Sequence, residues 1–178
     1  MIALSLRAIG IVLASGEGNM THVLVMGVCG CGKSSIGRAL ANDLGLVFVE
    51  GDAFHPPENI AHMQSGQPLN DDMRFGWLDA IGDAVVGSGR RCVIACSALK
   101  ETYRARLRSK IGDMTIIHLT GTPDLLRQRV EQRPSHFMPN SLVASQFADL
   151  EPPEGTGVIT IGVELTREDV TKQALSFI

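Results

Sequence analysis

The chain has 178 residues, of which 44% are hydrophobic and 20% are charged, a composition typical of a single globular domain with a substantial core. The formal net charge of −3 gives no reason to expect nucleic acid as a partner. No apolar run reaches the roughly 20 residues that a membrane-spanning helix needs, so no membrane association is expected.

Residues 1–19 precede the first recognisable motif. Their apolar stretch is a weak match to a signal peptide, because it lacks a basic start and is interrupted by Arg7 and Gly10. We expect the domain to comprise residues 20–178, with Met20 as the favoured initiator and 1–19 as a misassigned or disordered extension. A loosely held extension of the folded domain is the alternative.

The segment at 27–34, GVCGCGKS, matches G-x-x-x-x-G-K-[ST], the P-loop pattern. An apolar run at 23–26 indicates a buried strand before it, and apolar residues at helical spacing follow it as far as Leu44. Backbone amides at this strand-to-helix turn would bind nucleotide phosphates. Lys33 would reach the β- and γ-phosphates of ATP, and the Ser34 hydroxyl would hold Mg²⁺. The expected nucleotide-binding residues are Gly27, Val28, Cys29, Gly30, Cys31, Gly32, Lys33, Ser34 and Ser35.

The four cysteines form two pairs, Cys29 with Cys31 in this loop and Cys92 with Cys96 in an apolar strand. Neither pair has a zinc-site spacing, and both are unfavourable places for structural disulfides. We therefore expect reduced thiols in a cytoplasmic protein. Because Cys31 stands at the start of the predicted helix, we expect a lowered thiol pKa there and activity that is sensitive to oxidants.

Apolar strands alternate with helical patterns along the rest of the chain, which predicts an α/β fold of three layers, a central parallel sheet flanked by helices. The expected strands are 46–50, 92–96, 115–119 and 158–163, and the expected helices are 58–64, 71–86, 100–111, 122–133, 141–150 and 166–177. Asp52, Ser97 and Gly121 each follow a strand. Because ligands bind beyond the carboxyl ends of such strands, we expect these three residues to converge on the P-loop.

Asp52 is placed to face the γ-phosphate, where a carboxylate could orient a substrate hydroxyl or accept its proton. The alternative is an aspartate that only caps a turn. His55, beside two prolines, could bind substrate or only pack the loop.

Three cationic residues are further candidates for substrate binding. The Arg74 guanidinium suits a substrate carboxylate with bidentate geometry, and a surface ion pair with Asp71 is the alternative. Lys100 and Arg104 lie one helical turn apart near a strand end, which places them better for substrate than Arg108 on the next turn. A solvated helix face is the alternative for this stripe.

Arg129 and Arg133 are also one helical turn apart, and they precede an irregular segment at 134–139. Two arginines at the edge of such a segment are typical of a small lid, here about 129–143, that closes over phosphates. We expect them to act with Lys33 and Asp52 in catalysis. Structural arginines on a surface helix are the alternative.

Several segments together resemble the gluconate kinases, small P-loop carbohydrate kinases related to shikimate kinase. They are MGVCGCGKSS at 26–35, GDAFHPPENIAHMQSGQPLNDDMR at 51–74, WL at 77–78, CSALKETYRARLR at 96–108, HLTG at 118–121 and RVEQRPSHFMPNSLVASQFADLEPP at 129–153. The resemblance implies a P-loop kinase fold and ATP-dependent phosphorylation of D-gluconate at its 6-hydroxyl. It also implies Asp52 at the acceptor hydroxyl and a lid with Arg129 and Arg133. We include His136, in the same segment, among the substrate-binding candidates. The resemblance also suggests a homodimer.

The chain departs from the family pattern at several positions. Such kinases usually carry serines where this P-loop has Cys29 and Cys31. They often have a lysine at the position of His62, an acid at that of Met73 and a proline at that of Gly76. Cysteine is small enough for both loop positions, so we expect function to survive there.

Two other functions compete with this interpretation. One is a kinase for another small hydroxy acid, such as shikimate. The other is a nucleotide switch that hydrolyses ATP or GTP slowly. The switch predicts a guanine-specificity motif such as Asn-Lys-x-Asp, which the sequence lacks, and it gives the segments GDAFHP and HFMP no role.

Overall fold

The computed structural model describes residues 21–132 and 141–178, and its centre is a five-stranded parallel sheet. The strands are β1 (His22–Met26), β2 (Val47–Glu50), β3 (Cys92–Ala95), β4 (Met114–Thr120) and β5 (Val158–Gly162). Their order across the sheet is β2-β3-β1-β4-β5, and every neighbouring pair is parallel. The parallel α/β sheet predicted from the alternating pattern is confirmed.

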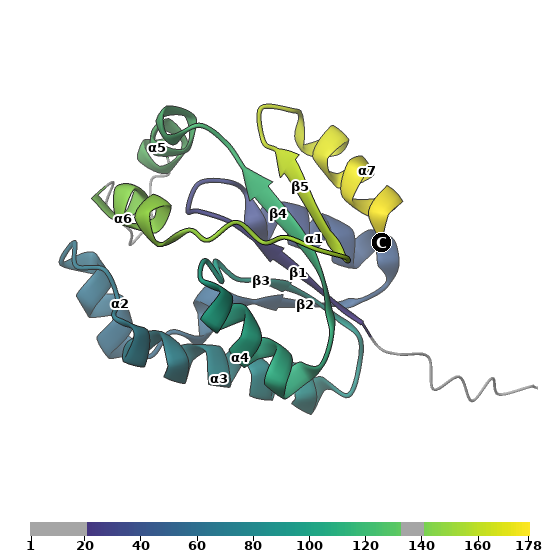
Figure 1. Cartoon of the computed structure of the whole chain (residues 1–178), viewed down its shortest axis with the longest axis horizontal. Helices are drawn as coiled ribbons and strands as arrows, with labels where there is room; N and C mark the ends of the chain where they lie inside the picture. The colour runs from purple at the N-terminus through teal and green to yellow at the C-terminus, as the bar shows by residue number, and fades with distance from the viewer. Residues whose placement is uncertain (1–20, 133–140) are drawn as a thin grey trace, which may run out of the picture.

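Helices cover both faces of this sheet (Figure 1). They are α1 (Lys33–Leu44), α2 (Pro57–Gln64), α3 (Asp71–Ser88), α4 (Glu101–Ile111), α5 (Pro123–Glu131), α6 (Ser141–Asp149) and α7 (Arg167–Phe177), with a short 3₁₀ helix, η1 (Gly51–Phe54), directly after β2. Helices α1 and α7 pack together on one face, while α3 and α4 pack together on the other. Among these helices of the described chain, none is long and apolar enough to cross a membrane.

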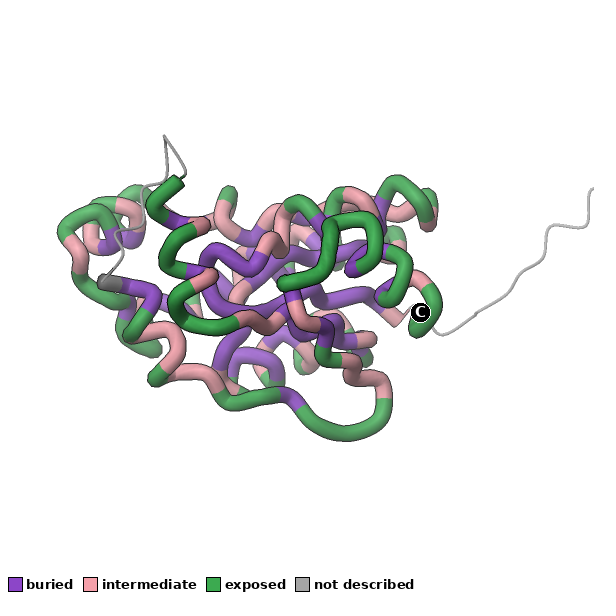
Figure 2. The backbone as a smooth tube through the Cα atoms, turned by 90° about the horizontal axis from the view of Figure 1, so that it is seen from above, coloured by how far each residue is buried: buried purple, intermediate pink, exposed green. Residues whose placement is uncertain are grey.

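The packing of strand β1 on both faces of the sheet explains why its sequence is a continuous apolar run. Val23 and Val25 belong to the core on the α1 and α7 side, whereas Leu24 and Met26 belong to the core on the α3 and α4 side. All four side chains are fully buried, and Figure 2 shows the buried strands lying between exposed outer segments. A strand with helices on both faces has no solvent side, so it carries a continuous apolar run rather than an alternating one.

The element bounds differ from the predicted ones by one or two residues at most ends, apart from two local features. Residues 51–54, which lie between a predicted strand and a predicted helix, form η1. Helix α3 continues through Gly87 to Ser88 and ends where Gly89 adopts a left-handed conformation with φ of 59°. Side chains cap two of the helices, because Asn70 accepts a hydrogen bond from the Met73 amide, and Thr166 accepts one from the Asp169 amide.

The carboxyl ends of β1, β2 and β3 meet at one edge of the sheet. The P-loop follows β1, Asp52 lies in η1 after β2, and Ser97 follows β3. These three join one cavity, as predicted. Gly121 does not line that cavity, because it is packed between α5 and the end of β5. A Cβ at this position would lie 2.9 Å from Val163 and 3.2 Å from Leu126.

Candidate active site

The P-loop is shaped by glycines and opens onto the first turn of α1. Gly27 has a φ of 140°, and a Cβ there would lie 2.3 Å from the Leu119 carbonyl oxygen, so only glycine fits beside β4. Gly32 precedes α1, and no side chain caps the helix. The first-turn amides are therefore available to an anion, with the positive end of the helix dipole behind them.

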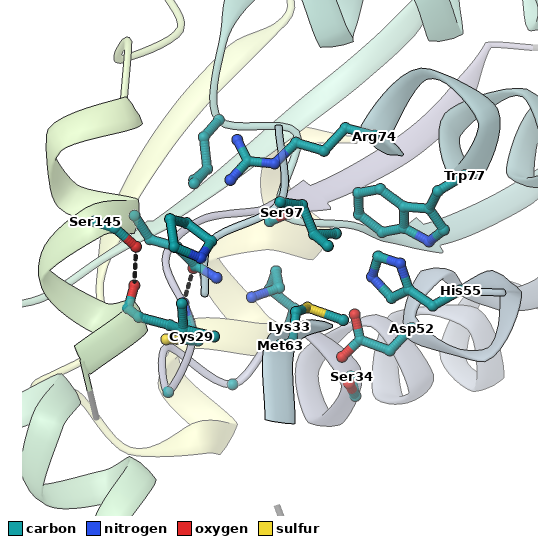
Figure 3. A pocket seen from close by; sticks show the side chains of 17 residues that line it. Cys29, Lys33, Ser34, Asp52, His55, Met63, Arg74, Trp77, Ser97 and Ser145 are labelled. Atoms are coloured by element: carbon teal, nitrogen blue, oxygen red, sulfur yellow. Dashed lines mark hydrogen bonds between the residues drawn. The ribbon is translucent and has the colours of Figure 1, made fainter. Parts of the chain in front are cut away.

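One cavity joins this loop to the end of β2 and the start of α3 (Figure 3). Lys33 and Ser34 line it from the P-loop side. Asp52, His55 and Arg74 line it from the other side. The structure thus brings these five residues together from three separate segments of the chain.

Lys33 lies folded back on its own loop, where its Nζ donates to the carbonyl oxygens of Gly27, at 3.0 Å, and of Val28, at 3.3 Å. Burial by itself lowers the pKa of this amine, but nearby acidic groups, Cys31 and Asp52 first among them, raise it above its ordinary value. Lys33 therefore stays charged, as a phosphate ligand must.

Asp52 lies in η1, and within the described residues its carboxylate makes no hydrogen bond or ion pair. Its backbone carbonyl, not its side chain, accepts from the His55 amide. The described structure therefore gives no support to the alternative that Asp52 only caps a turn, and its carboxylate is available to a ligand.

His55 and Trp77 form one wall of the cavity. Their rings stack with centroids 4.1 Å apart, and the Trp77 indole donates to the Gly51 carbonyl oxygen at 2.7 Å. Burial lowers the pKa of His55 to about 4, so the imidazole is neutral near pH 7. His55 thus packs against Trp77 and also lines the cavity, and its role in substrate binding stays a prediction.

Arg74 is buried and faces the cavity, and its ion-pair partner is not the predicted one. Its Nη1 donates to the Asp149 carboxylate at 2.8 Å and to the Tyr103 hydroxyl at 2.9 Å. Asp71 instead pairs with Lys100 at 2.9 Å. The alternative of a surface ion pair between Arg74 and Asp71 is therefore wrong, because the Arg74 side chain points inward from α3, toward α4 and α6.

Lys100 and Arg104 do not line the cavity. Lys100 lies beside it, held by Asp71. The Arg104 side chain is only 2% exposed, and its Nη1 donates to the carbonyl oxygens of Ala98 and Leu99. Arg104 thus secures the turn between β3 and α4. The prediction that Arg104 lies at the substrate is therefore wrong, and so is the alternative that its side chain is solvated, because the two carbonyl oxygens hold the side chain inside the protein.

Arg129 lies at a second, neighbouring cavity rather than beside Asp52. This cavity is on the outer side of the P-loop and is also lined by Cys31, Ser35 and Val163. Arg129 donates from Nη2 to the Val163 carbonyl oxygen at 2.7 Å. The other predicted lid arginine, Arg133, and the candidate substrate residue His136 lie outside the described residues.

The two loop thiols are buried, which argues against the reactive cysteine expected at Cys31. Cys29 is 4% exposed and Cys31 is 1% exposed. Burial raises the pKa of the Cys29 thiol to about 11, so it is protonated and a weak nucleophile near pH 7. All four cysteines are free, as predicted.

Helix α6 supplies site residues that sequence reasoning missed. The Gln146 side-chain oxygen accepts from the Cys29 amide at 2.7 Å, and Ser145 and Leu142 also line the main cavity. Trp77 was another omission. Both Trp77 and α6 lie in segments that resemble the gluconate kinases, but spacing along the chain carries no signal that α6 lies against the P-loop.

The chain is similar to known small-molecule kinases over most of its length. A family model described as shikimate kinase matches residues 29–148. The thermoresistant gluconokinase of Escherichia coli is 37% identical over 163 residues, which cover 88% of this chain and 93% of that protein. The gluconokinase of Gluconobacter oxydans is 43% identical over 134 residues, covering 74% of this chain and 75% of its own.

Solved structures show the same likeness in three dimensions. A gluconokinase from Sinorhizobium meliloti superposes with a TM-score of 0.80 at 42% identity, covering 88% of this chain and 90% of its own. A sugar kinase from Janibacter superposes with a TM-score of 0.82 at 42% identity, covering 88% and 93%. The fold is that of the P-loop kinases.

Proposed function

The chain belongs to the gluconokinase family of P-loop kinases, and from that membership we propose that it transfers the γ-phosphoryl group of ATP to the 6-hydroxyl of D-gluconate. The observation that supports this most directly is the shared cavity. It places a phosphate-binding loop with Lys33 opposite a free carboxylate, Asp52, and a buried guanidinium, Arg74. Phosphoryl transfer to a hydroxy acid needs these three kinds of group in one enclosure.

On the nucleotide side, the P-loop amides and the start of α1 would hold the ATP phosphates. Lys33 would exchange its two loop carbonyls for β- and γ-phosphate oxygens. The second cavity, with Ser35, Arg129 and Val163 on its lining, suits the nucleoside because it adjoins the outer side of the same loop. Replacing Arg129 by alanine should therefore raise the KM for ATP, whereas a fall in kcat alone would favour the phosphoryl-group role predicted from the sequence.

Ser34 fits a magnesium ligand, since it lines the main cavity next to Lys33 at the beginning of α1. Among the described residues there is no group of three or more His, Cys, Asp or Glu side chains that could hold a metal ion. A nucleotide-bound Mg²⁺ needs no such cage, because phosphates and water supply most of its ligands. When bound, Mg²⁺ would offset negative charge on the phosphates.

On the acid side, Arg74 would bind the gluconate carboxylate and Asp52 would orient the 6-hydroxyl. The hydroxyl oxygen forms a bond to the γ-phosphorus while the bond from that phosphorus to the β,γ-bridging oxygen breaks, which releases ADP. The hydroxyl proton passes to Asp52. The stacked rings of His55 and Trp77 would exclude water from one side of the reacting groups.

A coupled assay for ADP release tests the proposal, with gluconate, shikimate and no acid as the three conditions. We expect turnover with gluconate and very little in the other two. Turnover with shikimate instead would favour the second candidate, a kinase for a cyclic hydroxy acid, to which the match with the shikimate kinase model points. ADP release without any acid would favour a slow nucleotide hydrolase. A Lys33→Ala variant controls for contaminating kinases.

Three further expectations remain predictions. Arg133 and His136 would complete the lid and the acid site. A homodimer would be detected by light scattering coupled to size-exclusion chromatography.

A further inference from the structure

The guanidinium of Arg74 is anchored along one edge only. Its Nη1 donates both of its hydrogens, one to the Asp149 carboxylate and one to the Tyr103 hydroxyl. Within the described residues, Nε and Nη2 have no protein partner, and neither is among the fully buried atoms that lack one. The Nε–Nη2 edge is therefore the one left to the cavity that Arg74 lines.

This free edge has the geometry that a carboxylate requires. Two parallel N–H groups on one edge of a guanidinium can bind both oxygens of a carboxylate. An unanchored arginine would have to give up considerable rotamer freedom to present that edge. The two acceptors bound to Nη1 fix the orientation of the Arg74 guanidinium before the ligand binds. This lowers the entropic cost of binding.

The anchors are themselves held in place. The Tyr103 hydroxyl donates to the Asp71 carboxylate, which also accepts from Lys100. The Lys100 Nζ also lies 3.9 Å from the Asp149 Oδ1. Two carboxylates and two cations thus offset one another, so the cluster contributes little net charge to attract an anion. Its contribution is orientation.

We propose that Asp149 is a positioning residue for the acid substrate: through Nη1 it aims the Nε–Nη2 edge of Arg74 at the substrate carboxylate. The inference rests on the proposed function only in taking gluconate as that acid. Asp149 ends α6, the helix whose Gln146 contacts the P-loop. One helix therefore touches both the phosphate side and the acid side of the cavity.

The test compares Asp149→Ala, which removes the acceptor, with Asp149→Asn, which keeps an acceptor oxygen but removes the charge. We expect the alanine variant to raise the KM and Kd for gluconate about tenfold, equivalent to about 1.4 kcal/mol, with kcat changed less than twofold. The asparagine variant should restore most of the affinity. Gluconamide, which lacks the carboxylate charge, should bind wild type and the alanine variant equally.

Asp79→Ala is the matched control. Asp79 lies on α3 and, like Asp149, accepts from an arginine: Arg106 donates two hydrogen bonds to it, at 2.8 and 2.6 Å. Neither residue lines the cavity. This variant should alter the melting temperature without changing the affinity for gluconate. If Asp149→Ala behaves in the same way, Asp149 only fastens α6 to α3 and the proposal is overturned.

Binding is measured through the fluorescence of Trp77, the chain's one tryptophan, which lines the cavity. This signal does not require turnover. If wild type neither binds nor phosphorylates gluconate, the proposed function fails, and the same titration with the acid that the substrate panel identifies decides the role of Asp149. An unchanged affinity of Asp149→Ala for that acid would refute the positioning role.

Discussion

Replacing Asp52 by asparagine isolates the charge of the carboxylate that faces the P-loop. Asparagine keeps the shape of the side chain and one acceptor oxygen. Because the Asp52 carboxylate makes no hydrogen bond within the described part of the chain, the substitution leaves no described partner unpaired. We therefore expect the free energy of unfolding to change by less than about 0.5 kcal/mol, as is usual away from packed or bonded sites.

The kinetic effect should be far larger. Positioned general bases contribute about 10²–10⁴-fold, which corresponds to about 2.7–5.5 kcal/mol of transition-state stabilisation. The substitution does not change the charge of His55 or Lys33, so the loss of kcat reports on Asp52 itself. Losing the Asp52 charge lowers the pKa of His55 further, so His55 stays neutral, and during turnover Lys33 still has the ATP phosphates as its acceptors.

The measurement is steady-state turnover with gluconate and ATP, together with thermal unfolding. We predict a loss of kcat within that range, with the KM for ATP changed less than threefold. A matched Asp72→Asn variant, on the exposed first turn of α3, should leave kcat unchanged. If Asp52→Asn turns over at a near-normal rate, the catalytic assignment is wrong.

Three other predictions follow from buried side chains. Burial keeps His55 neutral with a pKa of about 4, whereas the unfolded chain takes up this proton near pH 6.5. Acidification from about pH 6.5 to about pH 4 should therefore cost up to about 3 kcal/mol of stability. The His55→Phe variant retains a ring against Trp77, and its melting temperature should fall less between pH 7 and pH 5 than that of the wild type. Equal falls in melting temperature would contradict the assignment. Arg104→Met should lower the free energy of unfolding by about 2–5 kcal/mol, because two carbonyls lose their donor. Urea titration measures this loss, and a large rise in the gluconate KM would instead place Arg104 at the substrate. In the native protein Cys29 and Cys31 should react slowly with a thiol reagent at pH 7, and a rapid reaction of either would contradict their burial.

Features that depend on local pattern could be predicted from the sequence alone. The P-loop, its strand and its helix follow from residue types at fixed spacing. The apolar run at β1 and the caps at Asn70 and Thr166 are local as well. The parallel order of the strands then placed Asp52 beside Lys33, because the carboxyl ends of parallel strands meet at one edge.

The roles of the cationic side chains could not be predicted in this way, because they depend on tertiary packing. An arginine in a helical stripe looks the same whether it faces water, backbone carbonyls or a cavity. Arg104 is buried because the turn after β3 presents two carbonyl oxygens to it. Arg74 is oriented by Asp149, which is 75 residues away along the chain. Such pairings depend on how helices pack across the sheet, and no spacing within a single segment encodes them.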